Sequence, residues 1–187
     1  MSNMSMPPSG LAEDILRNIT EGPGNDLHLV TFSLGEEFGV PIAQVQEIIR
    51  VGGITAVPNS PLYMEGVINI RGKILPVLNL RRKLSLPEVE ATKDSRIVVT
   101  EVNEKLLGLL VDSVSHVLKA PAGQIEAAPE EVLDMDTDYI TGVCKLGERL
   151  VILLDLERLL RREKLETNDG ATSPHDGATA TGQEGNY

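Results

Sequence analysis

Apolar and polar residues alternate over short stretches of this chain, and glycine or proline interrupts the stretches every several residues. The pattern predicts short β-strands of about five residues, joined by tight turns. A strand is expected over Leu27–Leu34, a turn and restart over 36–40, and another strand over Gln46–Val51. Three further pairs are predicted as β-hairpins: Val67–Ile70 with Ile74–Leu78, Arg96–Val102 with Leu106–Val111, and Val143–Leu146 with Leu150–Leu154.

Helical spacing occurs near both ends of the sequence. Over Asp155–Leu165, leucines recur at helical intervals behind Asp155, which is suited to cap the first turn. A shorter candidate helix, Leu11–Ile19, places Leu11, Ile15, Leu16 and Ile19 on one face. The mainly β core is therefore expected to end in one helix.

The sequence also contains an internal repeat. A shift of 76 positions aligns Tyr63 with Tyr139, Gly66 with Gly142 and Leu80 with Leu156. A shift of 69 positions aligns Gly39, Ile42, Val45 and Ile48 with Gly108, Val111, Val114 and Val117. Two copies of a small β-barrel are predicted, with approximate halves 27–85 and 94–164, a linker at 85–94, and exchange of strands between the barrels left open. Each copy alone would be marginal, so the shared interface should contribute much of the stability.

Composition narrows the class of protein. Aromatic residues make up 3% and tryptophan is absent, so the core must be aliphatic. The net charge is −11, yet residues 27–164 hold 16 bases and 20 acids, a balance that gives no support for nucleic-acid binding. The single Cys144 excludes an internal disulfide, and no apolar run is long enough for a membrane span. A cytoplasmic protein is predicted, with a flexible extension at 1–26 and a disordered acidic tail at 165–187.

One acidic segment has part of the ligand spacing of an EF-hand calcium-binding loop. Asp134, Asp136 and Asp138 have the spacing of the first three EF-hand ligands, but Tyr139 and Lys145 occupy the positions that require glycine and glutamate. A solvated acidic loop is therefore the better interpretation.

The remaining reactive side chains form no catalytic pattern. His28, His116 and His175 are scattered, and Cys144 lies in a predicted strand, where a buried small hydrophobe is expected. The sequence contains neither a glycine-rich phosphate loop nor a nucleophile elbow. No enzyme activity, cofactor or metal is predicted.

Residues 66–84 concentrate basic side chains in an otherwise acidic chain: Arg71, Lys73, Arg81, Arg82 and Lys83. In the second copy, Gly147 occupies the position of Arg71. Positions that agree between the copies are best explained by the fold, whereas positions that differ are free to serve recognition. Arg71 is therefore either a solvated turn residue or an interface anchor, a role in which arginine is common.

Four motifs in this order resemble the CheW domain family: 39–48, 66–81, 108–114 and 139–160. The second is close to the family signature Gly-Val-x-Asn-Leu-Arg-Gly, with Ile70 as a mild departure. The resemblance implies a mainly all-β fold of two SH3-like five-stranded barrels. It also implies a non-catalytic adaptor that couples methyl-accepting chemoreceptors to the histidine kinase CheA, recruited to receptor arrays at the inner face of the membrane without inserting into it.

The same resemblance places the family's arginine on Arg71 and its Gln-Glu pair on Gln46 and Glu47. The protein-binding residues expected from it are Val45, Gln46, Glu47, Gly66, Asn69, Arg71 and Gly72. The kinase surface in this family is largely apolar, and the sequence does not indicate which apolar residues are exposed.

Two alternatives stay open at this stage. The adaptor could serve a non-flagellar pathway, such as pilus motility or gene regulation. A small-ligand or nucleic-acid-binding SH3-like barrel would instead require exposed aromatic residues and a basic face, which the chain lacks. The extension and the tail are expected to be linkers or, alternatively, secondary docking segments.

Overall fold

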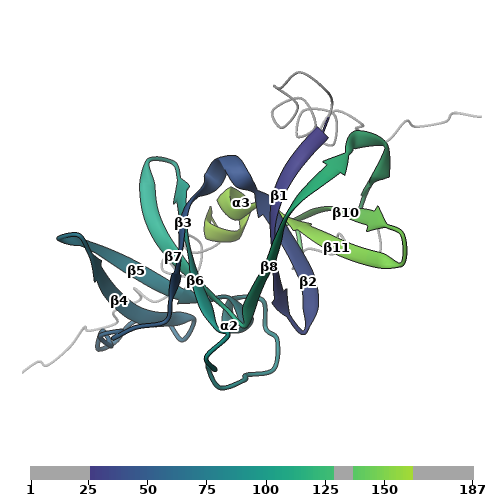
Figure 1. Ribbon diagram of the computed structural model, residues 1–187. Coiled ribbons are helices and arrows are strands. Elements are labelled where there is room, and N and C mark those ends of the chain that lie inside the picture. Colours follow the sequence, from purple (N-terminus) through teal and green to yellow (C-terminus); the bar gives the residue numbers. More distant parts are fainter. Residues whose placement is uncertain (1–25, 129–136, 162–187) are drawn as a thin grey trace, which may run out of the picture.

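The computed structural model describes residues 26–128 and 137–161 (Figure 1). Several expectations fall outside the described residues: the helix over Leu11–Ile19, the acidic tail at 165–187, and the positions of Asp134 and Asp136 in the acidic loop.

The described residues are mainly β, which confirms the predicted fold class. The strands are β1 (Asp26–Leu34), β2 (Glu36–Pro41), β3 (Val45–Arg50), β4 (Met64–Ile70), β5 (Lys73–Asn79), β6 (Arg96–Val102), β7 (Lys105–Val111), β8 (Ser113–Pro121), β9 (Ile125–Ala127), β10 (Ile140–Leu146) and β11 (Arg149–Leu154). The helices are α2 (Leu80–Lys83) and α3 (Leu156–Arg161), with single 3₁₀ turns η1 (Ile42–Gln44) and η2 (Ala122–Gln124). The three predicted hairpins are confirmed as β4–β5, β6–β7 and β10–β11.

Three elements escaped sequence analysis: α2, β8 and β9. The helix α2 has four residues, too few for a helical period to show. Val114 and Val117 lie three residues apart within β8 because β8 bulges between them: Val117 pairs with Val30 and Val114 with Phe32 of β1. The bulge breaks the alternation, so the segment does not show the period of two that indicates a strand.

The strands form two sheets. Sheet A has the order β8-β1-β2-β11-β10-β9, and sheet B has the order β3-β6-β7-β5-β4. Within each sheet, two antiparallel hairpins meet through a parallel contact, β2 with β11 in sheet A and β5 with β7 in sheet B. These are the two SH3-like barrels, and only sheet A carries a sixth strand, the three-residue β9.

The two sheets are built on the same plan. The orders of sheets A and B match strand for strand, with β8, β1, β2, β11 and β10 corresponding to β3, β6, β7, β5 and β4. Even β9 has a counterpart, because its Glu126 pairs with Val143 much as Thr55 forms an isolated bridge to Val67.

Each sheet is composed of strands from both halves of the sequence. Hairpin β1–β2 of the first copy lies in sheet A, and hairpin β6–β7 of the second copy lies in sheet B. Each copy has therefore placed its first hairpin in the sheet of the other copy, and the linker at 85–94 does not divide one sheet from the other.

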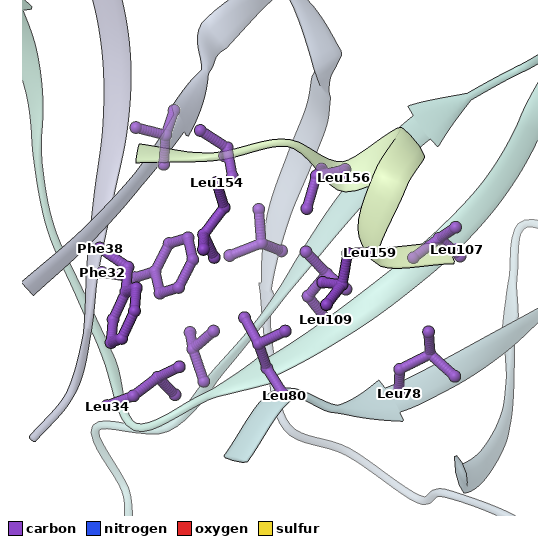
Figure 2. Packing of buried hydrophobic residues seen from close by; sticks show 14 of the residues in the cluster. Phe32, Leu34, Phe38, Leu78, Leu80, Leu107, Leu109, Leu154, Leu156 and Leu159 are labelled. Carbon is purple, nitrogen blue, oxygen red and sulfur yellow. The ribbon is translucent and has the colours of Figure 1, made fainter. Parts of the chain in front are cut away.

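The largest hydrophobic cluster lies between the sheets and includes residues of both. Phe32 and Phe38 of sheet A stack with ring centroids 6.2 Å apart, and Leu109 comes from sheet B. In Figure 2, Leu156 and Leu159 of α3 are directed into this cluster. Two smaller hydrophobic clusters fill the interiors of the two barrels, one cluster in each. The exchanged hairpins and the shared core make the two barrels one folding unit.

Both short helices start in the same way. Asp155 Oδ1 accepts a hydrogen bond from the backbone N–H of Arg158 at 3.0 Å, which confirms the predicted cap. Asn79 Oδ1 accepts the equivalent bond from Arg82 N at 3.2 Å, so the internal repeat extends to the caps.

Candidate protein-binding site

An exposed ion pair joins the tip of hairpin β4–β5 to strand β3. Arg71 Nη2 donates to Glu47 Oε2 at 3.3 Å, with the Arg71 side chain 81% exposed and that of Glu47 29% exposed. Strands β3 and β4 stand at opposite ends of the order of sheet B, so the pair closes the sheet on itself. The structure thus brings together two of the predicted site residues that are 24 positions apart.

The turn that presents Arg71 has an uncommon backbone. Arg71 and Gly72 occupy the two central positions between Ile70 and Lys73, with φ values of 52° and 84°. Two positive φ angles define a type I′ turn, which matches the twist of a hairpin. Asn69 supports the turn, because its Oδ1 accepts a hydrogen bond from Gly72 N at 2.9 Å. Asn69, Arg71 and Gly72 therefore act as one local unit.

Stability does not explain the arginine at this position. A non-glycine residue with this φ costs about 1 kcal/mol, and an exposed ion pair returns roughly 0–1 kcal/mol. The second copy avoids the strain, because Gly147 takes the equivalent position with a φ of 62°. Glu104, in the turn of hairpin β6–β7, is another exposed non-glycine residue with a positive φ, 63°, so the strain alone does not mark Arg71 as a contact residue. The role of Arg71 as an interface anchor stays a prediction.

Val45 and Gln46 do not join the ion pair. The register of β3 against β6 shifts between Val45 and Glu47, a bulge that breaks the regular alternation. Val45 packs against the shared core. Gln46 is exposed and its Nε2 donates to Glu101 Oε2 at 2.9 Å. Gln46 is thus available to a partner, whereas Val45 mainly holds the strand.

Gly66 is buried and serves the fold. A Cβ atom at this position would lie 2.3 Å from the carbonyl oxygen of Thr55, and the φ of Gly66 is 151°. The missing side chain lets Thr55 exchange two backbone hydrogen bonds with Val67, both 2.9 Å long. Gly142 does the same in sheet A, where a Cβ would lie 2.6 Å from the carbonyl oxygen of Glu126. Any effect of Gly66 on a partner is therefore indirect.

Comparison with known proteins decides the family. Residues 28–164 match the CheW-like domain. The chain belongs to the CheW-like domain family. It is 39% identical over 145 residues to the chemotaxis protein CheW of Klebsiella aerogenes, covering 77% of this chain and 87% of that protein. It is 35% identical to the chemotaxis protein CheW of Bacillus subtilis, covering 71% of this chain and 85% of that protein.

A further relative and a solved structure also support membership of the CheW-like domain family. The protein FrzA of Myxococcus xanthus is 30% identical, covering 70% of this chain and 82% of FrzA. The crystal structure of the scaffolding protein TtCheW from Thermoanaerobacter tengcongensis superposes with a TM-score of 0.66 at 33% identity, covering 71% of this chain and 91% of that one. Family and fold therefore agree with the two-sheet architecture.

Most of the basic cluster in this CheW-like chain is structural. Arg81 binds Asp112 through Nε at 2.9 Å and Nη2 at 2.5 Å, and this hydrogen bonding raises the pKa of the guanidinium. Arg82 pairs with Glu65 and Glu88, and Lys83 lies 4.1 Å from the centre of the Tyr63 ring. Sequence analysis missed these partners because they are far apart in the chain or lie in the linker. Arg71 and Lys73, both exposed, are the cations of the cluster that stay accessible to a partner.

A pocket of about 250 Å³ lies beside α2, with Arg81, Arg82 and Asp112 in its wall. Both guanidinium groups already have carboxylate partners, so the pocket has no free cation for an anionic ligand.

The described residues contain no group of three side chains that could hold a metal ion, and none of their helices could cross a membrane. Asp138 is exposed, and its carbonyl oxygen accepts from Arg158 at 3.2 Å. Cys144 is fully buried in the interior of sheet A, where burial raises the pKa of its thiol. Cys144 therefore packs as a small apolar residue.

Exposed apolar residues occur at equivalent positions of the two sheets. Ile74 of β5 is 62% exposed, and Leu150, its counterpart in β11, is 56% exposed. Ile48 of β3 and Val117 of β8 form a second exposed pair. These four positions are part of the accessible apolar surface that sequence analysis could not locate, which also includes Ile42, Val57, Leu62 and Val89.

Proposed function

We propose that this chain is a non-catalytic adaptor that couples methyl-accepting chemoreceptors to the histidine kinase CheA. The observation that carries the proposal is Arg71, an exposed arginine held on a strained turn that the second copy builds with glycine. Family membership supports the adaptor role, because relatives named chemotaxis protein CheW match most of the chain. The protein would be recruited to receptor arrays at the inner face of the membrane.

The receptor would bind at hairpin β4–β5 and the adjacent β3. The cytoplasmic part of such a receptor is a helical hairpin, so its apolar ridge would lie along the surface while polar groups fix the register. Arg71 and Glu47 supply charges of both signs within 3.3 Å. Ile74 supplies exposed apolar area beside them, because it pairs directly with Asn69 in the hairpin.

The kinase would bind the other sheet. Two partners held at the same time need separate surfaces, and Ile74 is adjacent to the receptor side. Its counterpart Leu150 lies in sheet A, paired with Lys145. The CheW-like domain of the kinase would therefore cover Leu150, barrel against barrel.

Binding measurements with each partner alone test this division. The chain should bind a receptor hairpin fragment and the regulatory domain of the kinase, and saturation with one should not displace the other. Leu150→Asp should weaken kinase binding by about tenfold or more, because a carboxylate would be buried in an apolar contact. Ile74→Asp, the matched control, should leave kinase binding unchanged. Equal loss of kinase binding in both variants would refute the assignment of the surfaces.

The alternative is the same adaptor role in a non-flagellar pathway. The similarity to FrzA shows that relatives of this domain occur under a name other than CheW. Identification of the receptor and kinase encoded beside this chain would separate the two pathways.

A further inference from the structure

Within residues 26–128 and 137–161, the chain passes from one sheet to the other at two places. Strand β2 of sheet A continues into β3 of sheet B through η1, and β7 of sheet B continues into β8 of sheet A through Asp112 alone. The backbone N–H of Asp112 donates to the carbonyl oxygen of Ser33 in β1 at 3.2 Å. The second crossover is therefore a single residue whose backbone is bonded to sheet A.

The side chain of Asp112 is held from sheet B by Arg81 of α2, the helix that directly follows β5 (Figure 1). Arg81 Nε donates to Asp112 Oδ1 at 2.9 Å, and Arg81 Nη2 donates to Asp112 Oδ2 at 2.5 Å. The remaining nitrogen, Nη1, donates to the carbonyl oxygen of Pro87 in the linker at 2.8 Å. A planar guanidinium bonded in this way is fixed in direction as well as in distance.

The same guanidinium lies beside a hairpin of sheet A. A Cβ atom built on Gly35, in the turn between β1 and β2, would lie 3.6 Å from Arg81 Nη2. Arg81 therefore joins α2, the crossover at Asp112 and the linker at one point next to sheet A. We call Arg81 and Asp112 the crossover pair.

The internal repeat does not reproduce the crossover pair at η1. The counterpart of Asp112 is Ala43, and the counterpart of Arg81 is Glu157. Glu157 forms its ion pair within its own helix, α3. None of the residues of η1 is buried, and Gln44 Oε1 is shielded from solvent without a hydrogen-bond partner among the described residues. The two crossovers are thus held in different ways.

The shared hydrophobic core does not by itself fix the angle between the sheets. Apolar contacts are non-directional, and packed elements can move past one another by small shear. Charge-assisted hydrogen bonds are strong and directional. The Arg81 side chain is only 11% exposed, so solvent screens the crossover pair much less than an ion pair on the surface.

We propose that the crossover pair fixes the angle between sheets A and B, and that Arg81 is thereby a positioning residue for the adaptor. The inference rests on the proposed function, in which the receptor binds sheet B at Arg71 and the kinase binds sheet A at Leu150. An adaptor that holds both partners must hold these two surfaces in one orientation. Without the crossover pair, each surface stays intact but the angle between them varies.

Pulsed electron paramagnetic resonance on the full chain tests the angle without either partner. In a Cys144→Ala background, Arg50→Cys and Glu148→Cys place one spin label on β3 and one at the tip of hairpin β10–β11, both at exposed positions. The unchanged pair should give one narrow distance distribution. Arg81→Met and Asp112→Asn should each widen it by about twofold, because the directional contact is lost. Arg81→Lys keeps the charge without the fork and should give an intermediate width.

Glu157→Met is the matched control, because Glu157 occupies the position of Arg81 in the second copy and should leave the distribution unchanged. A functional readout then separates positioning from contact. Arg81→Met should bind a receptor fragment alone, and the regulatory domain of the kinase alone, within about twofold of the affinity of the unchanged chain. Receptor-coupled kinase activation should nevertheless fall by about tenfold or more, because it depends on the position in which the kinase is held.

Three results would overturn the proposal: an unchanged distance distribution in folded Arg81→Met and Asp112→Asn, equal widening in Glu157→Met, or loss of binding to one partner alone. If Arg81→Met does not fold, Arg81→Lys carries the same test with the same outcomes. The distance measurement involves neither receptor nor kinase, so failure of the positioning role can be distinguished from failure of the adaptor role.

Discussion

Gly66→Ala should lower the free energy of unfolding by roughly 3 kcal/mol or more, which is large for the addition of one methyl group. The new Cβ would lie 2.3 Å from the carbonyl oxygen of Thr55, a backbone atom that cannot move aside without breaking its hydrogen bonds to Val67. The φ of 151° adds strain for any side chain. Urea unfolding followed by circular dichroism measures the change.

Gly123→Ala is the matched control. A Cβ at Gly123 would meet nothing within 4 Å, and the φ of Gly123 is not positive. The free energy of unfolding of the Gly123→Ala variant should stay within about 0.5 kcal/mol of that of the unchanged chain. If Gly66→Ala were equally stable yet failed to bind the receptor fragment, Gly66 would be a contact residue and its assignment to the fold would be wrong.

Arg71→Glu should abolish receptor-coupled kinase activation while leaving the fold intact. The substitution places a second carboxylate beside Glu47, where the arginine now lies 3.3 Å away. Loss of an interface anchor costs about 2 kcal/mol or more, which corresponds to about 30-fold in receptor affinity. Titration with a receptor fragment and a kinase assay on receptor vesicles measure the two effects.

Two companion variants separate the contact from the ion pair. Arg71→Gly removes the strain of the positive φ, so its stability should match or slightly exceed that of the unchanged chain, by up to about 1 kcal/mol. Its receptor affinity should nevertheless be low. Glu47→Arg combined with Arg71→Glu rebuilds the ion pair in reverse and should remain uncoupled. Recovered coupling in this double variant would show that the ion pair, and not the outward side chain, is what matters.

Local patterns in the sequence predicted the hairpins, but not the partners of each hairpin. Alternation over Val67–Ile70 and Ile74–Leu78 identifies two strands joined by a turn, because both depend on neighbouring residues. The exchange of β1–β2 and β6–β7 between the sheets depends on contacts between distant residues. Since the two hairpins are copies of one another, their own patterns favour neither sheet.

In the candidate site, too, the features that depend on contacts between distant residues could not be predicted from the sequence. The mismatch between Arg71 and Gly147 singled out the arginine from sequence alone, and the structure added its strained φ. The separate roles of Gln46 and Glu47 could not be predicted, because a bulge in β3 decides which side chain reaches Arg71. The burial of Gly66 also needed the structure, since the atom it accommodates belongs to Thr55.

The most direct test of the adaptor role is a bridging measurement with the full chain. A receptor hairpin fragment is immobilised, and the regulatory domain of the kinase is passed over it with and without this protein. The kinase domain should be retained only when the chain is present, and Arg71→Glu should release the chain and the kinase domain together. Retention of the kinase domain without the chain, or no retention with it, would contradict the account.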